Sequence, residues 1–343
     1  MRMLIESHAC LGSFGRDAAA LLNAFAHGAK NAWAEKADTS GLAEFYPARA
    51  LRQCDHFSRM ALLAAGRAFA ASGMPGAEKE GPAKGLAGSP AGDMGGNLGI
   101  VLASGYGPAM PTFDFLDSIL DHGEALASPL AFSLSVHNIP AAIVAKTMGI
   151  SGPCATVCQF ESSVASGLML AQGWLEEGRV TKVLFGAVDE VTATLQGICA
   201  AIAAGRGADA PAPRGKLPLG EAAVFFLLSG GDEAASGARG AARGEAGTGI
   251  IDAVSLSCVF GTDDETLPAD LRFMSGAFSP AERAALGALD GSAAYGNLPV
   301  AQALDLVLAL ELLRRDHLKT AVCLNRGSGA GSAVRLARAG AAL

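Results

Sequence analysis

One stretch of the chain holds the residues whose types and spacing could do chemistry. Residues 154–158 form a strand-like run, residues 159–161 form a turn, and Ser162 and Ser163 then open a long apolar helix. Such a turn places one side chain at a helix N-terminus, where backbone N–H groups converge and the dipole favours negative charge. Enzymes of several folds seat a nucleophile there. The residue on this seat is Glu161.

Few catalytic roles are open to the carboxylate of Glu161. It could act as a general base only if its pKa were raised, which a helix N-terminus opposes. The favoured interpretation is that Glu161 stabilises the helix start as an anion, an effect worth about 0.3–1 kcal/mol.

Other reactive side chains lie near this stretch. Cys158 precedes Glu161 by three residues, inside the predicted strand, and could reach the seat only with a different backbone. His137 lies before a predicted helix, where a histidine bonded to the backbone is more common than a catalytic one. The remaining histidines are expected at the surface or at loop edges, and they are His8, His27, His56, His122 and His317.

The sequence contains no pattern that indicates a metal or a cofactor. Cys154 and Cys158 have no His or acidic residue placed to complete a metal site with them, so both are expected to be small core residues. The glycines of residues 327–331 match neither a P-loop nor a dinucleotide-binding pattern. A tight turn is expected there, and we expect no metal and no cofactor.

Strand-like and helical runs alternate around the seat. This alternation predicts an α/β fold with central sheets covered on both faces. The expected strands are residues 2–5, 98–104, 154–158, 180–185, 224–228, 250–257, 320–324 and 333–337. The expected helices are residues 16–26, 55–72, 108–127, 141–148, 164–177, 195–204, 280–288 and 299–315, and residues 128–136 are expected to be extended.

Composition limits the class of protein. Half of the 343 residues are hydrophobic and only 17% are charged, which favours extensive buried structure and a buried subunit interface. The net charge of −7 with no basic run argues against a nucleic-acid partner. No apolar run approaches the ~20 residues of a membrane span. Seven scattered cysteines favour a reduced, cytoplasmic protein.

Seven runs, in order, resemble the β-ketoacyl synthases of the thiolase superfamily. They are MLIESHACLGSFGRDAAALLNAFAHG, DHFSRMALLAAGRAFAASG, SPLAFSLSVHNIPAAIVAKTMGISGP, WLEEGRVTKVLFGAVDE, LPLGEAAVFFLL, YGNLPVAQALDLVLALELL and NRGSGAGSAV. The resemblance implies a five-layer αβαβα sandwich of two similar halves. The halves would be residues 1–230, with a mobile loop at 74–96, and a shortened half at 250–343, joined by a linker at 231–249.

The resemblance also shows which catalytic residues are missing. The family nucleophile, a cysteine, corresponds to Glu161, and a carboxylate that attacked a thioester would give a high-energy mixed anhydride. The second histidine corresponds to Asn297, the lysine to Ser292 and the gatekeeper phenylalanine to Ser328. The segment of the first histidine is absent, and its nearest remnant is residues 260–263.

The family's other functional segments can be placed on this chain. The acyl-pocket and oxyanion loops would fall at Glu161, Ser162, Gly327, Ser328 and Gly329. Family members dimerise through a strand near the nucleophile, which would contain Ala155, Thr156, Val157 and Cys158.

Chain length factors and the related subunits of aryl-polyene clusters keep this fold and lose the cysteine. The leading hypothesis is therefore a condensation-inactive partner of an active synthase in fatty-acid, polyketide or aryl-polyene type biosynthesis, working with acyl carrier protein. Two alternatives stay open. One is a divergent acyl-carrier enzyme (a decarboxylase, thioesterase or acyltransferase) that uses Glu161, His137 or Asn297. The other is a homodimeric scaffold that binds acyl carrier protein.

Overall fold

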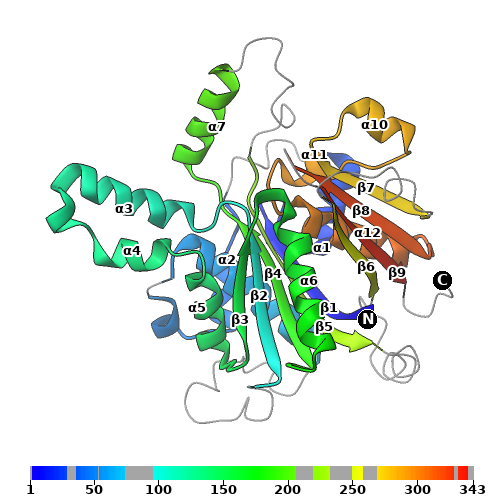
Figure 1. The fold of residues 1–343 in the computed structure, drawn as a ribbon, viewed down its shortest axis with the longest axis horizontal. Coiled ribbons are helices and arrows are strands. Elements are labelled where there is room, and N and C mark those ends of the chain that lie inside the picture. Colours follow the sequence, from blue (N-terminus) through cyan, green and yellow to red (C-terminus); the bar gives the residue numbers. More distant parts are fainter. Residues whose placement is uncertain are drawn as a thin grey trace.

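The computed structural model describes residues 2–28, 36–52, 54–73, 96–205, 219–231, 249–257, 269–327 and 331–338. Almost all of the loop expected at 74–96 and of the linker expected at 231–249 lies outside these ranges. The strands form one nine-stranded sheet in the order β3-β2-β4-β5-β1-β6-β9-β8-β7 (Figure 1).

The N-terminal part of the sheet contains five strands. From its edge inward these are β3 (Cys154–Cys158), β2 (Leu98–Ser104), β4 (Lys182–Asp189), β5 (Ala222–Gly231) and β1 (Arg2–Gly12). The first three are parallel to one another, and the pairings of β4 with β5 and of β5 with β1 are antiparallel. Buried apolar residues fill β2 and β4, as expected of strands covered on both faces.

The C-terminal part repeats this pattern with one strand fewer among the described residues. Its strands are β7 (Leu271–Gly276), β8 (Thr320–Arg326), β9 (Gly331–Arg338) and β6 (Gly249–Ser257). The pair β7 and β8 is parallel, and the next two pairings are antiparallel. In this correspondence β8 matches β4, and no described strand matches β3. The two parts join where β1 pairs with β6 over three residues.

Helices complete the layers. Helices α2 (His56–Ala71) and α5 (Ile139–Met148) pack on one face of the N-terminal strands. Helices α6 (Ser163–Glu176) and α12 (Ala301–Arg315) lie between the two parts of the sheet and share one core. The segment that carries α10 (Pro280–Ala285) packs on the far face of the C-terminal strands. This is the five-layer αβαβα arrangement, with a shortened C-terminal half, that the resemblance implies.

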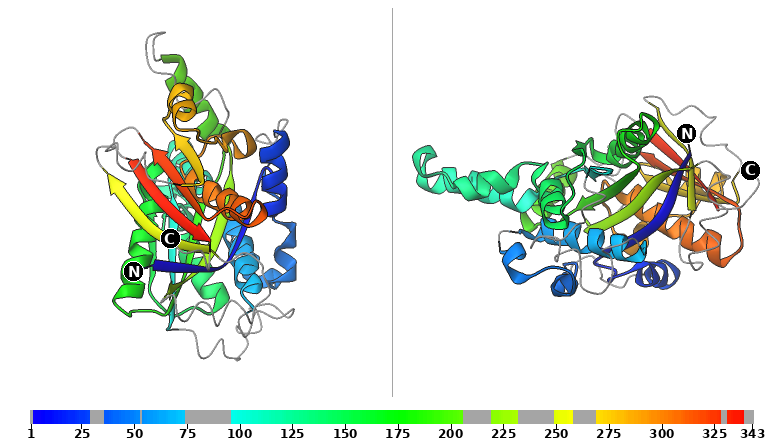
Figure 2. Two further views of the ribbon diagram at one scale, coloured as in Figure 1. Left: turned by 90° about the vertical axis from the view of Figure 1, so that its right-hand side faces the viewer. Right: turned by 90° about the horizontal axis from the view of Figure 1, so that it is seen from below.

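The remaining helices lie around this core. They are α1 (Ala18–His27), α3 (Ala109–His122), α4 (Pro129–Ser135), α7 (Ala193–Gly205), α11 (Ser292–Tyr295) and short 3₁₀ turns η2 (Ser40–Glu44), η3 (Ala48–Leu51), η5 (Glu124–Leu126) and η6 (Phe160–Ser162). Helices α3 and α4 project away from the sheet as an arm in Figure 1 and in the right-hand view of Figure 2. We call residues 109–136 the arm.

Two local expectations were wrong. Residues 128–136 are not extended, because α4 forms there with Pro129 in its first turn and the Ser128 hydroxyl accepting a hydrogen bond from the Ala131 N–H. Strand β7 was not expected at all. Its sequence, LRFMSG, contains arginine, serine and glycine, and it is a strand because it pairs with the distant β8.

The central position of α6 gives a stability prediction. Leu168 is 0% exposed in the shared core, whereas its neighbour Met169 is 42% exposed. Leu168→Ala should lower the free energy of unfolding by about 2–5 kcal/mol, because a cavity opens between the sheet layers. Met169→Ala on the same helix should change it by less than about 0.5 kcal/mol. Urea denaturation of both variants checks this, and equal losses would contradict the central placement of α6.

Candidate functional site

The predicted seat is a turn between β3 and α6 that buries Glu161 and Ser163. Glu161 lies in the 3₁₀ turn η6 and is 8% exposed. The preceding residue, Phe160, has φ +47°, in the left-handed region that costs a residue with a Cβ about 1–2 kcal/mol. Strained backbone persists where the surroundings determine it, and it clusters at functional sites. We call residues 159–163 the nucleophile turn, after the role that its position has in the family.

A buried serine stabilises this turn through hydrogen bonds. Ser163 is fully buried, and its hydroxyl oxygen accepts a hydrogen bond from the Gln159 N–H at 2.8 Å. The same hydroxyl can donate a hydrogen bond either to the Ser104 carbonyl at 2.8 Å or to the Phe160 carbonyl at 2.6 Å. The end of β2 and the nucleophile turn are therefore joined through one side chain.

Asp189, at the end of β4, organises the loop that follows β2. Its carboxylate accepts hydrogen bonds from the Ser104 hydroxyl at 2.8 Å, from the Gly105 N–H at 3.0 Å and from the Tyr106 N–H at 2.9 Å. Burial raises the pKa of Asp189 to about 6, against the opposite effect of these hydrogen bonds. Sequence reasoning missed this role, although an acidic residue after the apolar run of β4 is a signal for it.

The same loop contacts the segment expected to hold the second histidine. A Cβ on Gly105 would lie 2.1 Å from Pro299, so only glycine permits this approach. Asn297 is half-buried, and its carbonyl accepts a hydrogen bond from the Gly220 N–H at 3.1 Å. Residues 104–107 therefore pack against both segments that the family uses for catalysis.

A residue of the C-terminal half also stabilises the nucleophile turn. Asn325, at the end of β8 and 2% exposed, donates from Nδ2 to the main-chain carbonyl of Glu161 at 2.7 Å. Gly327 follows two residues later, and Ser328 and Gly329 lie outside the described residues. Asn325 is a site residue that sequence reasoning missed, because only the fold brings the two halves together here.

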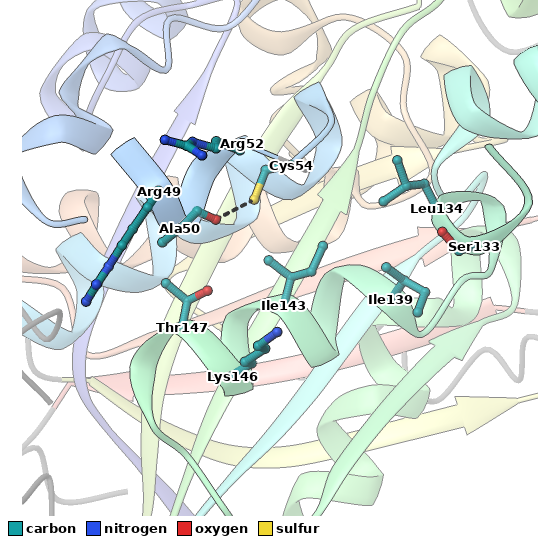
Figure 3. A pocket seen from close by; sticks show the side chains of 10 residues that line it. All are labelled: Arg49, Ala50, Arg52, Cys54, Ser133, Leu134, Ile139, Ile143, Lys146 and Thr147. Carbon is teal, nitrogen blue, oxygen red and sulfur yellow. Dashed lines mark hydrogen bonds between the residues drawn. The ribbon is translucent and has the colours of Figure 1, made fainter. Parts of the chain in front are cut away.

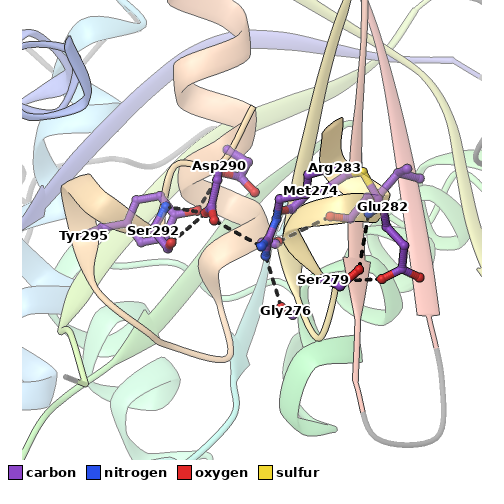
Figure 4. Close-up of polar contacts among 11 residues, drawn as sticks. Met274, Gly276, Ser279, Glu282, Arg283, Asp290, Ser292 and Tyr295 are labelled. Atoms are coloured by element: carbon purple, nitrogen blue, oxygen red, sulfur yellow. Dashed lines mark hydrogen bonds and ion pairs between the residues drawn. The ribbon is translucent and has the colours of Figure 1, made fainter. Parts of the chain in front are cut away.

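Ser292, at the position expected for the family lysine, forms hydrogen bonds within its own segment. The Ser292 N–H and hydroxyl both donate to Asp290, at 3.0 and 2.6 Å, and Arg283 pairs with the same carboxylate at 3.3 Å (Figure 4). Ser292 can supply no positive charge in place of lysine. The other remnant, residues 260–263, lies outside the described residues.

The histidines differ in part from expectation. His137 is exposed in the segment between α4 and α5, and its ring lies against Gly107, beside the loop that contacts the nucleophile turn. The expectation for His8 was wrong, since its side chain is 7% exposed and lies 3.4 Å from Glu311. His56 is also partly buried, and it pairs with Glu221 at 2.8 Å.

The cysteines of β3 are not core residues. Cys154 and Cys158 are both exposed at the sheet edge, contrary to expectation, because β3 has a neighbour on one side only. Partial desolvation, with the nearby Asp189 carboxylate, raises the pKa of the Cys158 thiol to about 11. The thiol is protonated near neutral pH, which makes it a poor nucleophile.

A second group of titratable residues lies under the site and was not predicted. Glu221 Oε1 accepts the Ala37 N–H and pairs with His56, and its Oε2 accepts the Val191 N–H at 3.2 Å. Next to it, Glu190 accepts the Met110 N–H at 2.9 Å. Burial, with Asp55 and Glu221 adding to it, raises the pKa of Glu190 to about 7. Since Met110 belongs to α3, this buried carboxyl group anchors the base of the arm.

The described ranges contain neither a candidate metal site nor a candidate membrane span. There, no group of three or more His, Cys, Asp or Glu side chains is arranged to hold a metal ion. No helix of those ranges has the length and apolar character needed to cross a bilayer.

Comparisons with known proteins agree with this architecture. Residues 89–195 match the family model described as beta-ketoacyl synthase, N-terminal domain. The fold is similar to that of "the ishigamide ketosynthase/chain length factor", with TM-score 0.67, 17% identity, and 99% of this chain and 100% of that chain covered.

Two further solved structures are similar. One is the AntDE:AntF complex of a type II PKS acyl-carrier protein with its ketosynthase bound to the hexaketide, with TM-score 0.73, 14% identity and 98% and 99% of the two chains covered. The other is a beta-ketoacyl synthase from Burkholderia phymatum STM815, with TM-score 0.68, 14% identity and the same coverage. No curated protein matched the sequence. The resemblance drawn from the motifs is thus confirmed, and the thiolase-like fold with it.

The raised pKa of Glu190 predicts pH-dependent stability. The folded state binds this proton more tightly than the unfolded state, so stability falls as pH rises from about 4.5 to about 7. Glu190→Gln removes the titration and keeps an acceptor for the Met110 N–H. The stability of Glu190→Gln relative to wild type should therefore increase by up to about 3 kcal/mol between pH 4.5 and pH 8.

Urea denaturation at several pH values measures this difference. Met169→Ala, at an exposed position without a titratable group, is the control and should show a pH-independent difference from wild type. A constant difference for Glu190→Gln as well would contradict the assignment.

Proposed function

We propose that this chain, which has the fold of the β-ketoacyl synthases, is a condensation-inactive subunit that pairs with a catalytic synthase and acts as a chain length factor does. It would work on chains carried by acyl carrier protein in fatty-acid, polyketide or aryl-polyene type assembly. The observation that carries the proposal is the nucleophile turn. The turn is held by both halves, and the residue that it buries where a condensing enzyme needs a thiolate is Glu161.

The neighbouring positions support the loss of condensation. Condensation needs a thiolate to accept the acyl chain and imidazoles to assist decarboxylation. Asn297 and Ser292 have no imidazole or ammonium group, and Ser292 is bonded to Asp290. Cys158 is protonated at neutral pH.

The exposed edge of the sheet supports a paired subunit. Strand β3 ends the sheet, so one side of its backbone has no neighbouring strand among the described residues. Its sequence, CATVC, has no charge or proline, the devices that normally protect an edge strand from pairing with another chain. Ala155, Thr156, Val157 and Cys158 are the residues that we propose at the subunit interface.

The arm supports the same interface. Eleven large hydrophobic residues are exposed in the part of the chain that the structure describes; seven of them lie on the arm and Phe160 lies beside β3. Leu120 and Leu126 are 82% and 71% exposed, and the tilted rings of Phe115 and Phe132 pack between α3 and α4 with their centroids 5.2 Å apart. A concentrated apolar surface next to an open strand edge is typical of a protein–protein interface.

Mass spectrometry after incubation with malonyl- and acyl-loaded carrier protein tests the proposal, with the chain alone and with its synthase. We expect no acyl adduct on this chain and a changed product length only when both proteins are present. An adduct, or release of free chains without the synthase, would instead support an acyl-carrier enzyme that uses Glu161, His137 or Asn297. A stable homodimer that leaves synthase products unchanged would support a scaffold.

The arm gives a prediction about assembly. Leu120→Glu should weaken association with the synthase at least tenfold, because it buries an unpaired charge in the interface. Met169→Glu introduces the same charge at a 42% exposed position on α6, outside the arm, and should leave association unchanged. Analytical ultracentrifugation of each variant with the synthase measures both. Equal effects of the two substitutions on association would contradict the proposed interface.

Glu161 gives a second prediction. Glu161→Gln should leave the rate and chain length of product formation by the two-protein complex within twofold of wild type. The turn is held by its main-chain carbonyl and by Ser163, and we assign the carboxylate no step. A loss of tenfold or more, with the complex still assembled, would contradict this.

A further inference from the structure

A cavity lies away from the nucleophile turn, between η3 and α5. Its volume is about 690 Å³, within the usual range for small-molecule sites. One wall is the η3 segment with Arg49 and Arg52, the opposite wall is α5 with Ile143 and Lys146, and the end of α4 closes one side (Figure 3). None of the lining residues belongs to the nucleophile turn or to the 104–107 loop.

The charged residues that line this cavity are of one sign. Arg49, Arg52 and Lys146 line it, and no Asp or Glu of the described part of the chain does. These three cations make no ion pair or hydrogen bond with the described part of the chain. A protein with a net charge of −7 thus gathers three cations at one pocket, with no counter-charge among the described residues that line it.

The part of the cavity away from the two arginines has several apolar residues in its lining (Figure 3). Leu134, Ile139 and Ile143 line the cavity from α4 and α5. An inorganic anion would gain nothing from these side chains, and a neutral lipid would gain nothing from the cations. The combination suits a molecule with an anionic head and an apolar body.

The wall that carries the arginines is held in place. Arg59 of α2 donates from Nε to the Cys54 carbonyl at 3.0 Å and from Nη2 to the Leu51 carbonyl at 3.2 Å. The opposite wall, α5, packs on α2 through Ala141 and Val144. Both walls are therefore built on α2, and a ligand would not have to organise them.

We propose that this cavity binds a small amphiphilic organic anion, an acyl or alkyl chain with a phosphate or carboxylate head. The head lies among Arg49, Arg52 and Lys146, and the chain lies on Leu134, Ile139 and Ile143. Arginine suits either head because its planar guanidinium group matches phosphate and carboxylate oxygens. The inference does not depend on the proposed function.

Calorimetric titration of the full chain with octyl phosphate, octanoate and octanol tests the site. We expect 1:1 binding of at least one anion, at least tenfold tighter than octanol. The stronger of the two anions identifies the head group. Equal affinity for the anions and octanol, or no binding of either anion, would overturn the proposal.

Variants locate the binding. The double substitution Arg49→Ala, Arg52→Ala should reduce affinity for the anion at least tenfold, and Arg49→Lys, Arg52→Lys should restore part of it. Ile143→Trp should abolish binding of every probe by filling the cavity. The matched control is Arg314→Ala, Arg315→Ala at the exposed end of α12, which should leave binding unchanged.

Two results would refute the site. One is anion binding that survives both the double alanine substitution and Ile143→Trp in folded protein. The other is binding of an acidic carrier protein that depends on Arg49 and Arg52 while no small anion binds, which would make the cations a protein-docking surface.

Discussion

Burial of two helices between two layers of sheet is the constraint on which the rest of this structure depends. Helix α12 is buried along most of its length, so every polar group on it needs an internal partner. Gln302 donates to the Cys323 carbonyl at 2.9 Å, and Asp305 accepts the Tyr295 hydroxyl at 2.6 Å. Burial raises the pKa of Asp305 to about 7. These hydrogen bonds fix the position of α12 between the two layers of sheet.

Helix α6 meets the same constraint with small residues. Gly167 faces Phe185 of β4, where a Cβ would lie 2.8 Å from the ring. This close packing holds α6 against β4, and the nucleophile turn lies at the start of that helix. The position of the turn is therefore tied to the central layer.

The sequence predicted most of the fold because its strongest patterns are local. Local sequence alone predicts the apolar strands β2, β4 and β5 and the capped helix α2. The predicted cap of α2 is present, since Asp55 accepts a hydrogen bond from the Ser58 N–H at 3.0 Å. The misses have non-local causes. Strand β7 exists through its pairing with β8, and α4 depends on a cap and a proline that a β-favouring run concealed.

The candidate site was predictable only in outline. Motif order located Glu161, Asn297 and Ser292, and the structure places the first two beside one loop. Neither Asn325 nor the Glu190 and Glu221 pair could be found in this way, since their partners are up to 184 residues away in sequence. Long-range hydrogen bonds leave no periodic trace in a sequence.

The bond from Asn325 has an evolutionary consequence. It reaches the carbonyl oxygen of residue 161, an atom that every amino acid supplies. A lineage could therefore exchange the side chain at this position and keep this link between the two halves. A reactive group could be lost here while the C-terminal half still holds the turn.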